Sequence, residues 1–353
     1  MLKGEIFVNQ LIKWYKHQKR DLPWRHTKDP YKIWLSEIIL QQTRVSQGMP
    51  YYLKFVEQYP TVHDLATANE QEVLRLWQGL GYYSRARNLH SCAKMVVQRY
   101  GGQFPDSFDE LLNLKGIGRY TAAAIASAAF NKPNAVVDGN VYRVLSRVFG
   151  VYDDISESKT QKVFEKLANQ LIPEINPGEY NQAIMDFGAI QCTPKSPACA
   201  ICPFTSACHA FNKGAIETLP VKTKKVNVKK LYFHYFIFEH NGEILMQERG
   251  PKDIWQGLYQ FYLIESESKM NIEDSLNSLY SRSHVVVIDI SEEVKHILTH
   301  RLILARFFRL QVDDLNTFVD IQNELKLMPY NLAEVHDLPK PILIQNYLKK
   351  EMF

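Results

Sequence analysis

Four cysteines fall within a short segment of the chain, in the pattern C-x6-C-x2-C-x5-C. Sulfur is a soft ligand that selects iron–sulfur clusters or zinc over harder ions, and four thiolates can hold the four corners of a [4Fe–4S] cluster. Structural zinc sites usually pair their ligands as two close doublets. This pattern contains one doublet, so zinc is the alternative that the spacing leaves open. The ligand set is Cys192, Cys199, Cys202 and Cys208.

The start of the chain bears on the state of these thiols. Its first ten residues contain no long apolar run and no small-residue cleavage site. This predicts a cytoplasmic protein in a reducing compartment, which makes disulfides the weaker interpretation of the cysteine segment. The fifth cysteine, Cys92, lies in the apolar helical stretch LHSCAKMVV and is expected to be a buried small hydrophobe. The small apolar run TAAAIASAAF has about half the length that a membrane span needs.

The pattern of apolar residues changes near residue 211. A chain of 353 residues is long for one core, so two domains are expected. Segments before the change, such as TQKVFEKLANQLIPEI, have helical periodicity, whereas later segments such as KLYFHYFIF and SHVVVIDI are short, β-branched or aromatic. The sequence predicts a helical domain over 1–210, a basic linker over 211–230 and a smaller α/β domain over 231–353. A net charge of +4 neither requires nor excludes nucleic acid.

Two glycines in LKGIGRYTAAA indicate a tight turn between two helices. The backbone N–H groups after Gly116 and Gly118 could face a phosphate oxygen at the start of the second helix. A tight connection without a ligand is the alternative for this motif alone. About 20 residues later Asp138 precedes a helix that carries Arg143 and Arg147. A carboxylate close to a phosphate site repels the ligand, so its presence suggests chemistry. A simple N-cap is the other explanation.

These motifs occur in the order found in the helix-hairpin-helix superfamily of DNA glycosylases, in its endonuclease-III-like branch. Within that branch the segments LPWR, DPYKIWLSEIILQQTRV, WQGLGYYSRARNLH and NQAIMDFGAIQCTPKSPAC resemble those of the A/G-specific adenine glycosylases. The resemblance implies an all-α glycosylase domain whose [4Fe–4S] loop spans 192–208, followed by an α/β Nudix-like domain. It also implies base excision repair: hydrolysis of the N-glycosidic bond of adenine mispaired with 8-oxoguanine or guanine.

The resemblance assigns roles to four residues of the helical domain. Glu37 matches the general acid that protonates adenine, and apolar neighbours would raise the pKa of its carboxyl toward neutrality. Asp138 matches the ionised carboxylate that stabilises charge on the sugar, so that two carboxyls have opposite tasks. Asn140 and Tyr120 match supporting positions. Lyase relatives have a lysine where this chain has Tyr120, so we expect adenine removal without a true lyase step; Lys115 is a less suitable substitute.

Further positions are matched to DNA and to the extruded base. The residues expected to enter or contact DNA are Gln42, Leu80, Tyr82, Gly116 and Gly118. Those expected near the adenine pocket are Trp24, Arg25 and Gln182, with a core aromatic as the alternative for Trp24. The cysteine loop presents Lys195 and is expected to dock DNA and order the fold, not to hydrolyse the bond.

The second domain departs from the Nudix pattern. The metal-binding helix R-E-x-x-E-E is missing from SESKMNIEDSLNSLYSR, so substrate recognition is preferred over nucleotide hydrolysis. The family contacts 8-oxoguanine through a Phe-Ser-His loop, and here the aligned residues are Leu298, Thr299 and His300. The hydroxyl and the imidazole are thus retained, while the aromatic ring is lost.

Three other functions remain to be weighed against adenine removal. They are a bifunctional pyrimidine glycosylase with lyase activity, an iron–sulfur redox sensor without catalysis, and a nucleotide pyrophosphatase. Tyr120 opposes the first, the joint presence of Glu37 and Asp138 opposes the second, and the missing acids oppose the third. The expected partners are double-stranded DNA with A:8-oxoguanine or A:G mispairs and other repair or replication proteins. The expected state is a monomer without membrane contact.

Overall fold

The computed structural model describes residues 3–224, 227–271 and 284–351. Contacts divide the chain into two compact units. The first contains residues 1–67 and 88–224, and the second contains residues 68–87 and 225–353. The second unit therefore includes a segment that the sequence assigns to the helical domain.

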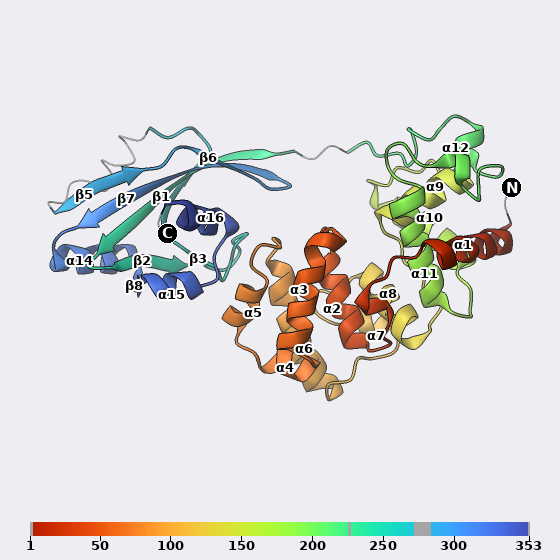
Figure 1. Cartoon of the computed structure of the whole chain (residues 1–353), viewed down its shortest axis with the longest axis horizontal. Helices are drawn as coiled ribbons and strands as arrows, with labels where there is room; N and C mark the ends of the chain where they lie inside the picture. Colours follow the sequence, from red (N-terminus) through yellow and green to blue (C-terminus); the bar gives the residue numbers. More distant parts are fainter. Residues whose placement is uncertain (1–2, 225–226, 272–283, 352–353) are drawn as a thin grey trace. The chain divides into compact units, whose positions relative to one another are not determined.

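The first unit is helical, as predicted (Figure 1). Its segments, including helix α6 that begins in 68–87, are α1 (Gly4–Gln18), η1 (Pro23–Arg25), α2 (Pro30–Leu40), α3 (Val45–Gln58), α4 (Val62–Thr67), α6 (Ser84–Tyr100), α7 (Phe108–Leu112), α8 (Arg119–Phe130), α9 (Gly139–Phe149), α10 (Ser158–Leu171), α11 (Pro177–Asp186), the π-helical turn η2 (Phe187–Gln191), η3 (Cys199–Ile201) and α12 (His209–Asn212).

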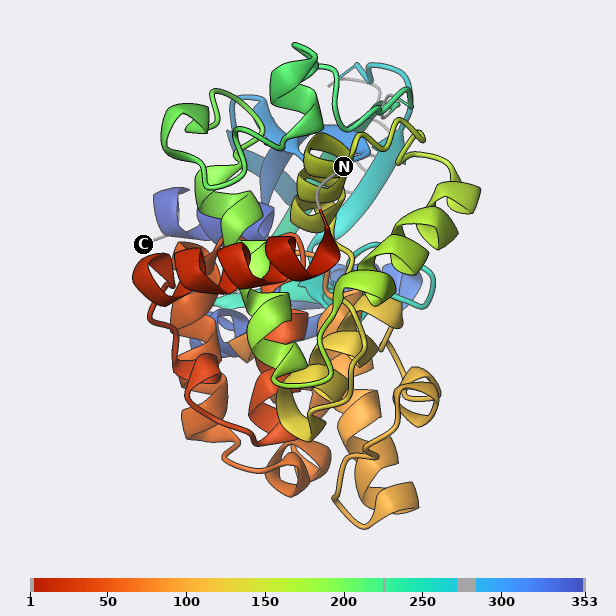
Figure 2. The ribbon, with the colours of Figure 1, turned by 90° about the vertical axis from the view of Figure 1, so that its right-hand side faces the viewer.

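Two central helices of this unit explain how the candidate residues are held. Helix α2 begins after Asp29, whose side chain accepts a hydrogen bond from Tyr31 N at 3.0 Å, and it is apolar around nearly its whole circumference. Helix α8 is the TAAAIASAAF run and is also buried. Helices that are apolar all round belong inside a core. Helix α11 packs against α1 and α8, and α1 crosses α11 in Figure 2.

The second unit is built on a mixed sheet. Its elements are α5 (Glu70–Leu76), β1 (Lys229–His240), β2 (Glu243–Glu248), β3 (Tyr259–Gln260), β4 (Tyr262–Ser266), β5 (Val285–Ile290), β6 (Val294–Ile297), β7 (Arg301–Val312), α14 (Leu315–Leu325), β8 (Met328–Asn331), α15 (Leu332–Asp337) and α16 (Ile342–Glu351).

The long strands β1 and β7 form the centre of this sheet and run parallel, whereas the other pairings are antiparallel. The strand order is β3-β2-β1-β7-β5, with β4 paired to β1, β6 to β7 and β8 to β2. Phe308 belongs to the same hydrophobic core cluster as Phe318 of α14, while Phe307 stacks on Tyr347 of α16 with ring centroids 3.9 Å apart. Since successive strand residues face opposite sides, both faces of β7 are covered.

Two expectations concern the remaining parts of the chain. Cys92 is fully buried in α6, as predicted. The stretch expected to lack the Nudix acids includes residues 272–283, which lie outside the described residues. In the described ranges, no helix combines the length and the apolarity that a membrane crossing requires.

Candidate active site

The carboxyl of Glu37 is enclosed by the first unit. Glu37 lies on α2 between buried apolar residues and is 8 % exposed. Burial raises the pKa of Glu37 to about 7, and the charge of Asp138 adds to the increase. A hydrogen bond with Tyr120 and the charge of Arg25 act in the opposite direction. The pKa therefore lies where a carboxyl can begin a reaction protonated at neutral pH.

Asp138 lies at the start of α9 and is also an N-cap. Its Oδ1 accepts hydrogen bonds from Asn140 N at 2.9 Å and Val141 N at 2.8 Å, and its Oδ2 accepts one from Asn140 Nδ2 at 2.8 Å. Burial raises the pKa of Asp138, while these hydrogen bonds and the charge of Arg143 oppose the increase. The N-cap explanation is therefore confirmed, while the catalytic role of the same carboxylate stays a prediction.

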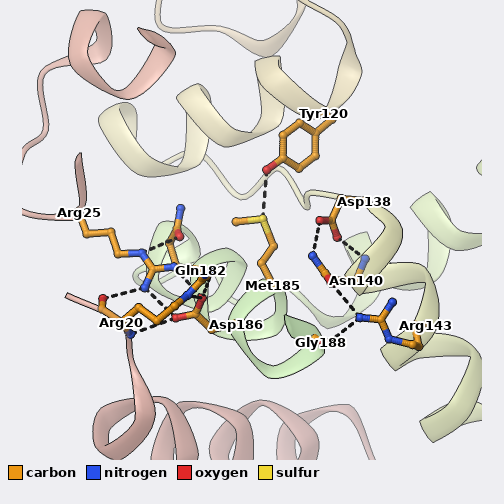
Figure 3. Close-up of polar contacts among 10 residues, drawn as sticks. All are labelled: Arg20, Arg25, Tyr120, Asp138, Asn140, Arg143, Gln182, Met185, Asp186 and Gly188. Atoms are coloured by element: carbon orange, nitrogen blue, oxygen red, sulfur yellow. Dashed lines mark hydrogen bonds and ion pairs between the residues drawn. The ribbon is translucent and has the colours of Figure 1, made fainter. Parts of the chain in front are cut away.

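Asn140 is held in turn by Arg143 (Figure 3). Arg143 Nη2 donates to Asn140 Oδ1 at 2.8 Å and to Gly188 O at 2.6 Å. A Cβ atom on Gly188 would lie 2.6 Å from Asn140 Cβ, so the backbone of η2 approaches Asn140 as closely as glycine permits. The orientation of the Asp138 carboxylate consequently depends on the π-helical turn. π-Helical turns are rare in proteins, and those that occur are often found at functional sites.

Tyr120 interacts electrostatically with both carboxyl groups, those of Glu37 and Asp138. Its hydroxyl donates to Met185 Sδ at 3.1 Å and also shares a hydrogen bond with Glu37. The phenol proton can turn from the sulfur to the ionised carboxylate of Glu37, and for this reason the hydrogen bond lowers the pKa of Glu37. Burial raises the pKa of Tyr120 well above its ordinary value, so the side chain stays neutral.

A cavity of about 450 Å³ lies against Glu37 in the first unit. This volume is typical of small-molecule sites. The three residues expected near the adenine pocket, Trp24, Arg25 and Gln182, all line it. Trp24 is also 6 % exposed and packs on Tyr52 with ring centroids 5.0 Å apart, so it serves the core as well.

Asp186 holds the two arginines that line this cavity, Arg20 and Arg25. This residue was not identified from the sequence. Its carboxylate is fully buried and accepts hydrogen bonds from Arg25 Nη1 at 2.7 Å, Arg25 Nη2 at 2.8 Å and Arg20 Nε at 2.8 Å. Burial acts to raise the pKa of Asp186, but the two guanidinium groups outweigh it and the pKa is lowered. Arg25 Nε also donates to Gln182 Oε1 at 3.0 Å. The available signal was an acid among apolar residues in AIMDFGAI, because a buried Asp needs a partner of opposite charge.

The glycine hairpin connects α7 and α8. Gly116 has φ of 76°, and a Cβ atom there would lie 2.8 Å from Asn88 Cβ. Both the backbone conformation and the available space therefore require glycine at this position. Gly118 is the N-cap of α8 and provides no side-chain cap, which leaves the first N–H groups of the helix open to an anion. Lys115 is exposed beside it.

The residues expected to enter DNA differ in their exposure. Gln42 follows α2, is exposed and has φ of 55°, a conformation uncommon outside glycine. In the second unit, Tyr82 is 43 % exposed and its hydroxyl contacts that of Thr299. His300 is exposed next to it. Leu80 is 6 % exposed, so its side chain supports this turn from within.

The four cysteines of the loop converge in the first unit. Cys202 interacts electrostatically with Cys192, Cys199 and Cys208, and all four are free thiols. Across the described ranges, no group of three or more His, Cys, Asp or Glu residues is arranged to hold a single ion. A four-iron cluster makes a different demand, because its thiolates bind separate corners.

Arg147 supplies positive charge to the cysteine loop. Its Nη1 lies 3.5 Å from Cys192 Sγ and also donates to Thr193 O at 2.7 Å, while Arg143 Nε donates to Cys192 O at 2.7 Å. These guanidinium groups would offset the negative charge that four cluster-bound thiolates bring. The donor set therefore fits this cofactor, and both arginines tie the loop to α9.

Comparison with known proteins assigns both units. Residues 35–170 match the HhH-GPD superfamily of base excision DNA repair proteins, and residues 234–350 match the NUDIX domain. A thermostable thymine-DNA glycosylase has a TM-score of 0.56 and 34 % identity, covering 60 % of this chain and 97 % of that chain. Endonuclease III, trapped in a covalent intermediate with DNA, has a TM-score of 0.53 and 26 % identity, covering 61 % of this chain and 99 % of that chain. The fold is that of a helix-hairpin-helix repair glycosylase followed by a NUDIX-type domain, as predicted.

Similarity over the whole chain is more specific. The adenine DNA glycosylase of Buchnera aphidicola subsp. Baizongia pistaciae is 33 % identical over 343 residues, which are 96 % of this chain and 95 % of that protein. The adenine DNA glycosylase of Homo sapiens is 45 % identical over 222 residues, covering 60 % of this chain and 41 % of that protein. The chain belongs to the adenine DNA glycosylase family, whose members are hydrolases of N-glycosyl bonds.

Burial of Glu37 predicts a pH-dependent stability difference. The pKa of Glu37 rises from 4.5 to about 7 on folding, so the native state holds the proton more tightly. Wild type should lose stability relative to Glu37→Gln as pH rises from 4.5 through 7, by about 3 kcal/mol in total. Urea unfolding of both proteins between pH 5 and 8 measures this, with exposed Glu57→Gln as control. Parallel curves for wild type and Glu37→Gln would contradict the burial argument.

Loss of the Asp186 charge should destabilise the cavity wall. Asp186→Asn leaves the guanidinium of Arg25, whose side chain is 9 % exposed, without its buried counter-charge. We expect a decrease of about 3–5 kcal/mol in the free energy of unfolding, as for other broken buried pairs. Asp21→Asn is the matched control, because the Asp21 side chain is 90 % exposed and pairs with an exposed His26. Equal effects of the two substitutions would show that Asp186 is no anchor.

Proposed function

We propose that this enzyme hydrolyses the N-glycosidic bond of adenine mispaired with 8-oxoguanine or guanine in duplex DNA, without a lyase step. One observation carries the proposal. A buried carboxyl with a pKa of about 7, Glu37, lines a cavity with base-sized room and lies in the field of a second carboxylate, Asp138. The names of the bacterial and human relatives support adenine as the base.

The cavity supplies groups that suit adenine. Gln182 Oε1 is occupied by Arg25, so the amide N–H₂ remains to donate to a ring nitrogen of the base. The indole of Trp24 gives an apolar surface for the flat ring. Extrusion costs the base its stacking and pairing interactions in the duplex, and contacts of this kind replace part of them.

Bond cleavage then needs the two carboxyl groups in different states. Protonated Glu37 gives its proton to N7 of adenine as the C1′–N9 bond breaks and its electron pair leaves with the base. Asp138 faces the positive charge that remains on the sugar, and the hydrogen bonds from Asn140 and Val141 favour its ionised form. Water adds to C1′, and the proton that it releases restores Glu37.

Three further parts of the proposal rest on particular residues. Tyr120 occupies the hairpin position where lyase relatives have lysine, and a phenol cannot form a Schiff base. Thr299 and His300, at the turn before β7, provide a hydroxyl and an imidazole for 8-oxoguanine. The four loop cysteines would hold a [4Fe–4S] cluster that orders the DNA-binding surface, and no step of hydrolysis passes through it.

Single-turnover cleavage of a duplex with adenine opposite 8-oxoguanine tests the function. Wild type should yield strand breaks at the adenine after alkali treatment and none without it. Glu37→Gln should be slower by about 10²–10⁴-fold, the range of a general acid. Borohydride should trap no protein–DNA adduct. Absence of adenine release by folded wild type, or efficient trapping of an adduct, would contradict the proposal.

The pH dependence follows from the same carboxyl. Glu37 acts in its protonated form, so the single-turnover rate should decrease as pH rises through about 7. Rates between pH 5.5 and 9, measured at saturating enzyme, give the midpoint. A rate that stays constant from pH 6 to 9 would exclude Glu37 as the acid.

A further inference from the structure

Residues 68–87 fold with the second unit through contacts at both ends of the segment. At one end Arg75 forms an ion pair with Asp337 at the end of α15. At the other end Arg87 Nη1 donates to Gln256 O at 2.6 Å. Between them lies the turn that presents Tyr82. The position of this tyrosine is therefore set within the second unit.

The turn itself is built to hold one conformation. Trp77 Nε1 donates to Gly81 O at 3.0 Å, which closes the turn, and Gly81 has φ of 73°. Tyr82 follows with φ of 50°, which is uncommon for a residue with a side chain. Its hydroxyl then contacts Thr299. An uncommon backbone conformation of this kind persists only where the surrounding contacts hold it in place. The residues that precede the turn must therefore be held as well.

Gln78 provides that fixed point. Its Oε1 accepts a hydrogen bond from the backbone N of Lys340 at 3.1 Å. Lys340 is 2 % exposed, and its Nζ donates to His336 O at 3.0 Å and to Leu338 O at 2.7 Å. The ammonium thus holds the chain between α15 and α16 in the shape that presents the amide to Gln78. Burial lowers the pKa of Lys340 to about 8, in keeping with this enclosure.

We propose that Gln78 is a positioning residue for Tyr82, acting through its hydrogen bond to the Lys340 amide in the second unit. This inference rests on the proposed function, in which Tyr82 enters the duplex. It makes the 338–341 segment, remote from the candidate active site in sequence, part of the apparatus that extrudes adenine. Gln78 touches neither the base nor the sugar in this account.

A double-mutant cycle between Gln78 and Tyr82 tests the proposal in the full-length protein. The readout is the single-turnover rate of adenine release opposite 8-oxoguanine at subsaturating enzyme. Gln78→Leu removes the acceptor at nearly constant volume and should lower the rate about five- to tenfold, as expected when the hydrogen bond from the Lys340 amide is lost. Gln78→Glu keeps an acceptor oxygen and should restore the rate to within about twofold of wild type.

The Tyr82→Leu background separates positioning from general damage. If Gln78 acts through Tyr82, Gln78→Leu should have no further effect once Tyr82 is replaced. An equal decrease in both backgrounds, or no decrease in either, would overturn the proposal while wild type remains active. Wild type without any adenine release would instead overturn the proposed function. Thermal unfolding of each variant confirms that the compared proteins are folded.

Discussion

A single stretch of chain, from Gln182 to Gly188, contacts residues from several parts of the candidate active site. Gln182 is bonded to Arg25, Met185 accepts from Tyr120, and Gly188 accepts from Arg143. Asp186, between them, neutralises the arginines of the cavity. The end of α11 and the π-helical turn after it thus link the base cavity to Tyr120 and, through Arg143 and Asn140, to Asp138. Gln182, Met185 and Asp186 lie three and four positions apart on α11 and so share one face of this helix, while Gly188 belongs to the π-helical turn that follows.

The two carboxyl groups illustrate how one environment can serve opposite needs. Burial raises the pKa of both Glu37 and Asp138. Asp138 accepts three hydrogen bonds from residues at the start of α9, and these favour its anion. Glu37 has a hydrogen bond with one neutral phenol, that of Tyr120, so the effect of burial on its pKa is the larger and the pKa is raised. The division of roles therefore follows from local hydrogen bonding and not from depth alone.

Sequence patterns predicted those features that short segments determine. Helical and strand periodicity gave the two kinds of fold, and the glycines of the hairpin gave its turn. Asp138 and Asn140 are two residues apart at one helix start, so a local hydrogen bond between them is accessible from sequence, whereas the role expected for Asn140 came from the resemblance. Tertiary contacts were not: Asp186 meets Arg20 across 166 positions, and the docking of 68–87 on the second unit depends on residues more than 160 positions away. Leu80 was expected at the DNA surface and is buried.

The central claim is that Glu37 is a neutral acid in the folded enzyme at the pH where it acts. Carbon-13 NMR of protein labelled at the glutamate carboxyl carbons, taken as the difference between wild type and Glu37→Gln, observes this group directly. The account predicts a carboxyl signal that titrates with a midpoint near 7. A signal already ionised at pH 5.5 in the folded protein would contradict it.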